Sequence, residues 1–148
     1  MTAPKLPDVS LDAAPAFLRQ AGLRVHEATA TRVTGTIAAG PDHHTPWGVV
    51  HGGVYTTAIE SACSIGASLA AIERGEFAVG LANQTDFLRP FVEGELRVTA
   101  TPIQQGRTQQ LWQCEIARPD GKLVARGQLR LQNVPLREGD GSRGPGVA

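Results

Sequence analysis

Residues 53–72 form the segment that most limits how this chain can fold. On a helix, with 100° of rotation per residue, its apolar side chains fall on one face. These residues are Val54, Ala58, Ala62, Ile65, Leu69 and Ile72, and the face is widened by Tyr55, Ile59, Gly66 and Ala70. The opposite arc carries hydroxyl side chains and a single charge, Glu60, where a solvated helix would carry several charges. We therefore expect protein to cover this helix on most sides, including a second subunit.

The rest of the chain is dominated by alternation of apolar and polar residues, which is typical of β-strands. It appears within residues 23–38 and again in several stretches after residue 76, separated by turn sequences such as RPDGK at 118–122. Residues 38–48 are rich in Gly and Pro and predict a loop. The pattern predicts an α+β fold in which a curved antiparallel sheet wraps around one long central helix.

The domain boundaries follow from the same patterns. We expect an N-terminal segment over residues 1–22 with one short helix, capped by Asp12 and closed by Gly22. The domain itself is expected over residues 23–135. The tail, 136–148, is rich in glycine and charge and is predicted to be disordered.

Composition limits the classes of function. The 148 residues suffice for one domain, and 14 Lys and Arg balance 14 Asp and Glu, so no electrostatic footprint for nucleic acid is present. No apolar stretch reaches the roughly 18 residues that indicate a membrane span. The first ten residues lack the apolar region of a secretory signal, so a cytoplasmic protein is expected. Cys63 and Cys114 lack metal-ligand spacing and are predicted to be buried thiols.

The residues around the helix start carry the candidate chemistry. Gly52 and Gly53 leave main-chain N–H groups open to an oxyanion or a polarised carbonyl, although a tight turn would also require glycine. Glu60 lies in a segment predicted to be buried, where a carboxylate costs free energy through desolvation. Such a residue is kept either for function or for a structural hydrogen bond, for example with Arg89.

The spacing of Gly52 and Glu60 constrains the assembly. Eight residues of helix separate them by roughly 12 Å, so one carbonyl cannot meet both at distances of about 3 Å. If they cooperate, two such helices run antiparallel across a two-fold axis. This predicts an obligate homodimer with two composite sites, each combining Gly52 of one chain with Glu60 of the other.

The segment HTPWGVVHGGVYTTAIES, residues 44–61, resembles the HGG-x(6)-E/D signature of hotdog-fold acyl-CoA thioesterases. The resemblance extends over residues 23–133 and includes VGLANQTDFLRP, EGELRV and GRTQQLWQCEI. It is strongest to the PaaI-like group, which includes the Arthrobacter-type 4-hydroxybenzoyl-CoA thioesterase and 1,4-dihydroxy-2-naphthoyl-CoA-type enzymes. It implies a hotdog fold, a CoA thioester as substrate, no cofactor and no metal. It also implies a homodimer that associates further into a homotetramer.

The resemblance also implies roles for single residues. Glu60 matches the catalytic carboxylate, acting as nucleophile or as general base on water, and the Gly52 N–H polarises the thioester carbonyl. His51 orients the loop or the substrate, and Ser64 holds the attacking water. Thr45 stands where relatives commonly have Gln or Asn, whose side-chain amide assists the thioester. Here water or His44 would take over the role of that amide, or activity is weak.

Further residues match substrate-binding positions. Arg89, Arg107 and Thr108 match positions that contact the CoA phosphates. Gly53 is also expected to take part in substrate binding. Two alternatives remain open beside acyl-CoA hydrolysis. One is an acyl-CoA-binding hotdog protein without turnover, and the other is a hotdog dehydratase or hydratase.

Overall fold

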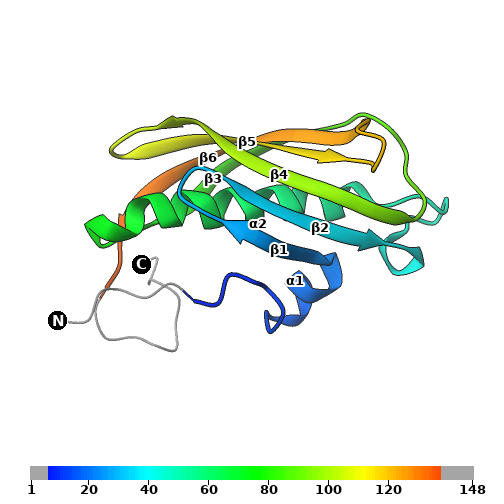
Figure 1. The fold of residues 1–148 in the computed structure, drawn as a ribbon, viewed down its shortest axis with the longest axis horizontal. Helices are drawn as coiled ribbons and strands as arrows, with labels where there is room; N and C mark the ends of the chain where they lie inside the picture. Colours follow the sequence, from blue (N-terminus) through cyan, green and yellow to red (C-terminus); the bar gives the residue numbers. More distant parts are fainter. Residues whose placement is uncertain (1–6, 138–148) are drawn as a thin grey trace.

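The computed structural model of the chain describes residues 7–137. One antiparallel sheet, with strand order β1-β2-β4-β5-β6-β3, curves over the long helix α2 (Figure 1). The strands are β1 (Leu23–Ala28), β2 (Val33–Ala39), β3 (Glu76–Phe87), β4 (Gly94–Gln105), β5 (Gln109–Ala117) and β6 (Leu123–Pro135). The helices are α1 (Ala16–Ala21), α2 (Gly52–Ala71) and the short 3-10 helices η1 (Pro41–His43) and η2 (Ile72–Arg74). The predicted α+β fold with a central helix is confirmed.

The core lies between α2 and the sheet, as the alternation predicts. In β5, Trp112, Cys114 and Ile116 are buried against the helix, whereas Gln113 and Glu115 are exposed. Glycine at position 66 permits the close contact, because a Cβ there would overlap the Trp112 ring. Cys63 and Cys114 are free and buried, as predicted. The neighbouring Cys114 thiol, together with burial, raises the pKa of Cys63.

Helix boundaries differ from the prediction at the N-terminal side. Helix α1 begins at Ala16 after Pro15, without a side-chain cap, so the prediction that Asp12 caps it is wrong. The residues before it form a separate turn, in which the Ala14 N–H donates to the Leu11 carbonyl. Gly22 does close α1, with φ at 86° and its N–H donating to Leu18. Helix α2 begins and ends one residue earlier than the predicted 53–72.

Two further expectations concern the sequence ends and the strands. Residues 23–38 make two strands, because a turn at Thr29–Arg32 folds β1 back on β2. Strand β6 ends at Pro135, and nearly all of the tail predicted to be disordered lies outside the described residues. Within the described part, no helix is long and apolar enough to cross a membrane.

Strand β3 is an edge of the sheet with an unusual exposed surface. It pairs with β6 on one side only. Most of its residues from Gly80 to Phe87 are exposed, and the large apolar side chains Leu81 and Phe87 are 51% and 58% exposed. A long apolar edge strand with unpaired main-chain groups is a template for pairing with another strand.

Candidate active site

His51 organises the start of helix α2. It is the N-cap residue, and its ring Nδ1 accepts a hydrogen bond from the Gly53 N–H at 2.8 Å. The His51 N–H in turn donates to the His43 carbonyl at 2.8 Å, which ties the cap to the preceding loop. The expectation that His51 orients this loop thus matches its contacts.

The two glycines at the helix start are not equivalent. The Gly53 N–H is used by His51, and the Gly53 carbonyl accepts hydrogen bonds from the hydroxyls of Thr56 and Thr57. The Gly52 N–H has no hydrogen-bond partner within residues 7–137. At the positive end of the α2 dipole, Gly52 is therefore the glycine whose N–H can bind an oxygen from outside the chain.

Gly52 lies on a shallow cleft of about 240 Å³. The loop before α2 and the end of β3 form its walls, and Tyr55, Phe87 and Arg89 are among the lining residues. Phe87 packs directly on Gly52, because a Cβ on the glycine would overlap the phenyl ring. Any larger residue at position 52 would displace Phe87.

Glu60 and Ser64 lie together on a second, larger cleft of about 410 Å³. They are one helical turn apart on α2, and the opposite wall comes from the N-terminal segment through Leu11, Phe17 and Leu18. Glu60 is exposed in the single chain, so the chain itself does not provide its predicted burial, which would require a second subunit. The reason is that Glu60 lies on the arc of α2 that its own sheet does not cover.

Gly52 and Glu60 thus line different clefts of one chain, as their spacing predicts. Each has a neighbour on strand β3. Phe87 contacts Gly52, and a Cβ on Gly80 would lie 3.5 Å from Glu60 Oε1. Both halves of the candidate site therefore border the exposed sheet edge.

Thr45 makes its hydrogen bonds within its own loop. Its hydroxyl accepts a hydrogen bond from the Trp47 N–H, and its carbonyl accepts one from Gly48, where φ is 78°. Thr45 lines neither cleft. His44 does not replace it, because its ring Nε2 is 2.6 Å from the Val92 carbonyl oxygen. The structure does not bring Thr45 to the other candidate residues.

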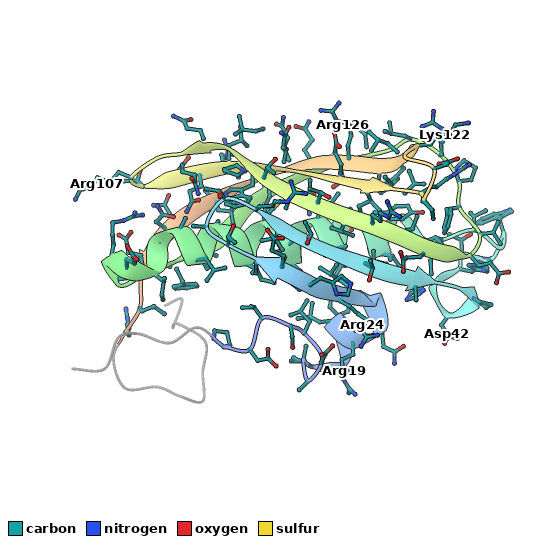
Figure 2. All side chains as sticks on the ribbon, viewed as in Figure 1. Arg19, Arg24, Asp42, Arg107, Lys122 and Arg126 are labelled. Carbon is teal, nitrogen blue, oxygen red and sulfur yellow. The ribbon has the colours of Figure 1, made fainter. Side chains whose placement is uncertain are left out.

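The expected CoA-binding residues lie at opposite ends of the sheet. Arg89 lines the cleft of Gly52, and its guanidinium donates to the Leu123 carbonyl at 2.8 Å. Arg107 and Thr108 are exposed in the β4–β5 turn, and Figure 2 shows Arg107 at the end of the molecule far from Lys122. In one chain, therefore, Arg107 and Thr108 are separated from Arg89.

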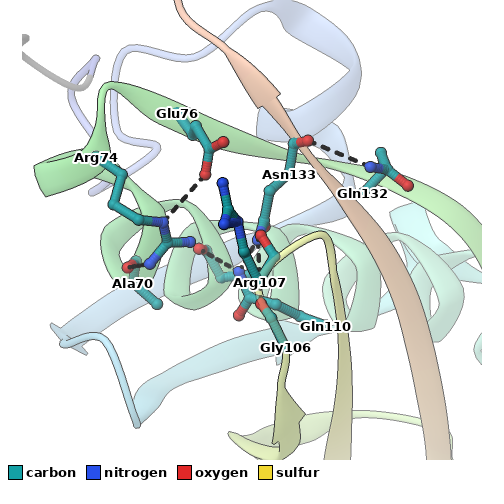
Figure 3. A network of polar contacts seen from close by, with 9 residues as sticks. Ala70, Arg74, Glu76, Gly106, Arg107, Gln110, Gln132 and Asn133 are labelled. Atoms are coloured by element: carbon teal, nitrogen blue, oxygen red, sulfur yellow. Dashed lines mark hydrogen bonds and ion pairs between the residues drawn. The ribbon is translucent and has the colours of Figure 1, made fainter.

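A buried polar network holds this β4–β5 turn (Figure 3). Asn133 donates through Nδ2 to the carbonyls of Gly106 and Arg107, and its main-chain N–H donates to Thr108. Gln110 donates to Asn133 Oδ1 at 2.8 Å and to the Ala67 carbonyl of α2 at 2.9 Å. Gln110 and Asn133 are only 2% and 6% exposed, so the turn is fixed from inside the protein. Sequence reasoning missed both residues, because each stands in a strand pattern without a distinguishing motif.

Tyr55 is a further residue of the Gly52 cleft that the sequence does not distinguish from core. It is 2% exposed, and burial raises the pKa of its hydroxyl to about 12. Among the described residues, its hydroxyl is the buried side-chain polar atom without a hydrogen-bond partner. The one signal in the sequence is its position three residues after Gly52. No cluster of three or more His, Cys, Asp or Glu suited to a metal is found in residues 7–137.

Comparison with known proteins supports the fold and identifies the family. The family model of the thioesterase superfamily matches residues 48–125. A proposed esterase of Mycobacterium tuberculosis is 47% identical over 92 residues, which cover 61% of this chain and 66% of that relative. Its solved structure, 38% identical, has a TM-score of 0.80 and covers 83% of this chain and 99% of that chain.

Two further relatives carry more specific names. The crystal structure of a thioesterase from Haemophilus influenzae has a TM-score of 0.80 at 26% identity, covering 93% of this chain and 98% of that chain. A 1,4-dihydroxy-2-naphthoyl-CoA hydrolase of Listeria monocytogenes is 36% identical over 81 residues, or 55% of this chain and 65% of that relative.

The curved sheet around one helix is the hotdog fold, and the class of protein it defines here is that of thioester hydrolases. The chain belongs to the thioesterase superfamily. The narrower PaaI-like assignment stays a prediction.

Proposed function

We propose that this protein hydrolyses acyl-CoA thioesters at a site shared by two subunits. The observation that carries the proposal is the position of both halves of the site along β3. Glu60 lies beside Gly80 and Gly52 beside Phe87, and this strand is an exposed edge.

Pairing two copies of β3 would join the halves. An antiparallel pair with its two-fold axis between residues 83 and 84 sets Gly80 of one strand opposite Phe87 of the other. Directly opposed residues in such a pair lie about 4.5–5.5 Å apart. This register brings Glu60 of one chain toward the Gly52 of its partner and covers the exposed Leu81 side chain, while Phe87 faces a glycine of the partner, which has no side chain to hold the ring. Further association into a homotetramer is part of the proposal.

The chemistry assigned to this site is hydrolysis without a cofactor. The Gly52 N–H donates to the thioester carbonyl and stabilises the negative charge that develops on its oxygen. Acting as general base, Glu60 takes a proton from a water held by Ser64, and the water oxygen bonds to the carbonyl carbon. The C–S bond then breaks, and the CoA thiolate takes up the proton, leaving the free acid.

A nucleophilic role is the alternative for the same carboxylate. Glu60 would bond to the acyl carbon and expel CoA as thiolate, and water would then cleave the resulting anhydride. A single turnover in ¹⁸O-labelled water separates the two. The general-base route puts the label in the product. In the nucleophilic route, attack of water on the Glu60 carboxyl carbon of the anhydride leaves a Glu60 oxygen in the first product and the label in Glu60, so label found in Glu60 identifies the nucleophilic route.

CoA recognition is assigned to arginines at the rim. Arg89 beside Gly52 and the Arg107–Thr108 turn carry groups suited to phosphate oxygens. In the proposed dimer, the Gly52 cleft of one chain, with its Arg89, adjoins Glu60 of the other. Both chains would therefore contribute to binding one CoA.

Mixed dimers test the shared site. Glu60→Gln and Gly52→Val homodimers are each expected to lose at least about 10²-fold in thiol release from a panel of aryl- and fatty-acyl-CoAs. A mixed dimer contains one intact site of two, so purified mixed dimers should show about half the wild-type rate. No recovery in purified mixed dimers would contradict a composite site.

The alternative function is acyl-CoA binding without turnover. It stays open because Thr45, at the position where the resemblance expects Gln or Asn, lines neither cleft. A binding protein would retain acyl-CoA affinity in Glu60→Gln and release no thiol in its wild-type form. A hotdog dehydratase or hydratase would instead change the acyl chain and leave the thioester intact.

A further inference from the structure

The Tyr55 hydroxyl is an energetic anomaly in an otherwise satisfied core. The side chain is 2% exposed, and within residues 7–137 its oxygen has no hydrogen-bond partner. Leaving a buried polar group unpaired destabilises the fold, and phenylalanine at this position would avoid that cost. A group from outside the described residues, such as a bound substrate, could supply the partner of this hydroxyl.

The place of Tyr55 indicates what that partner is. It lies one helical turn after Gly52 on the same face of α2, and helical side chains lean back toward the N-terminus. Tyr55 and Gly52 also line the same cleft. The hydroxyl-bearing ring thus borders the N–H group to which the proposed function assigns the thioester carbonyl.

Phe87 stands between this ring and solvent. Its ring centroid is 6.1 Å from that of Tyr55, with the planes tilted by 52°, and the same phenyl group packs on Gly52. Because Phe87 is 58% exposed and at the end of β3, its side chain can turn aside without opening the core. Such a rotation would uncover Gly52 and Tyr55 together.

The site also needs a second donor. Thr45, which stands where the resemblance expects Gln or Asn, does not line the cleft of Gly52. One main-chain N–H would then stabilise the carbonyl oxygen alone. A neutral phenol is a hydrogen-bond donor of the required kind.

We propose that Tyr55 is a catalytic residue that donates a second hydrogen bond to the thioester carbonyl, beside Gly52, when Phe87 turns aside. The inference rests on the proposed function and adds to it the residue that replaces the missing amide. No proton is transferred: the phenol keeps its hydrogen throughout, while the C–O bond forms and the C–S bond breaks as above. Because burial raises the pKa of Tyr55 to about 12, the hydroxyl remains a donor at neutral pH.

Tyr55→Phe in the intact protein tests this, because it removes one oxygen atom. We expect kcat for acyl-CoA hydrolysis to fall about 10–10²-fold with KM little changed, while the free energy of unfolding stays the same or rises. Ser68→Ala is the matched control, since Ser68 is a buried hydroxyl on the same helix that accepts a hydrogen bond from the Ala78 N–H. It should lose stability and keep kcat.

The carbonyl stretching frequency of a ¹³C-labelled thioester, bound to Glu60→Gln protein, provides an independent readout. Tyr55→Phe in that background should reduce the shift to lower frequency that binding causes. An unchanged kcat, or an unchanged carbonyl frequency, overturns the assignment of Tyr55 and leaves the proposed hydrolysis standing. If the wild-type protein releases no thiol from any acyl-CoA, the proposed function fails, and the role of Tyr55 fails with it.

Discussion

The His51 imidazole accepts a hydrogen bond from the Gly53 N–H at 2.8 Å, and this contact leaves Gly52 as the open amide of the helix start. In the proposed reaction we therefore expect the histidine to act through the loop geometry. Its Nδ1 does for α2 what the side-chain oxygen of Asn or Asp does at other N-caps.

This relationship predicts different effects for two substitutions at position 51. His51→Ala removes the cap and should lower the free energy of unfolding by about 1 kcal/mol, and kcat should fall as the Gly52 amide loses its fixed orientation. His51→Asn restores a capping oxygen and should recover most of both. Chemical denaturation and thiol-release kinetics measure the two quantities. Equal losses of kcat in both variants would assign His51 a role beyond capping.

The pKa of Tyr55 predicts a stability change at high pH. Its value is about 12 in the folded protein against 10.0 for the free side chain, so the fold favours the protonated hydroxyl. This contribution is fully present below pH 10 and is lost as pH rises from 10 to 12. Wild type should therefore lose stability across this window more steeply than Tyr55→Phe. Tyr55 is the single tyrosine, so tyrosinate absorbance follows it directly, and a midpoint near 10 in the folded protein would contradict the prediction.

Because Asn133 holds the β4–β5 turn, substituting it should change both the stability of the protein and its affinity for CoA. Asn133→Leu leaves the Gly106 and Arg107 carbonyls and Gln110 without their partner, and should cost about 3 kcal/mol of stability in total. If Arg107 and Thr108 bind CoA phosphates, KM should rise more for an acyl-CoA than for the matching acyl-pantetheine, which lacks the nucleotide. Gln109→Ala, which removes an exposed hydrogen bond beside the same turn, is the control and should change neither quantity appreciably. A parallel rise in both KM values would mean that the turn does not bind the nucleotide.

The periodicities predicted the fold because buried residues recur every second position along the strands and with the helical period along α2. The predicted stripe on α2 is buried at Val54, Ala58 and Ala62 but only half-buried at Ile65, Leu69 and Ile72, and the alternation in β4, β5 and β6 marks the residues that face the helix. The pattern did not predict which part of α2 the chain itself covers. A helical pattern does not distinguish the arc covered by the chain's own sheet from an arc that only a second chain could cover.

The site was predictable only in part, for similar reasons. Spacing alone separated Gly52 from Glu60, and the resemblance supplied their roles. That Gly53 is engaged by His51, that Thr45 is held by Trp47, and that Tyr55 lacks a partner are consequences of tertiary contacts. A single sequence contains no periodic signal for hydrogen-bond satisfaction, so these distinctions required the structure.

The cleft of Glu60 predicts how acyl groups are selected. Phe17 and Leu18 of α1 face Ile65 of α2 across about 410 Å³, and Glu60 is the single charged residue in the lining. An uncharged apolar acyl group fits such walls, whereas a second carboxylate on the acyl chain would be repelled by Glu60. Helix α1 lies outside residues 48–125, the part that the family model matches.

Phe17→Ala should therefore change selectivity among acyl-CoAs without changing the fold. Phe17 is 71% exposed in the single chain, so its loss should leave the free energy of unfolding nearly unchanged. Removing the ring should lower kcat/KM for the preferred apolar acyl-CoA by about 10-fold, as expected for about 1.4 kcal/mol of lost contact, and should affect acetyl-CoA far less. Arg19→Ala in the same helix is the control, because Figure 2 shows Arg19 directed away from the body of the protein. An equal loss for long and short acyl groups would instead place Phe17 in the subunit interface, which a shift in the dimer dissociation constant would confirm.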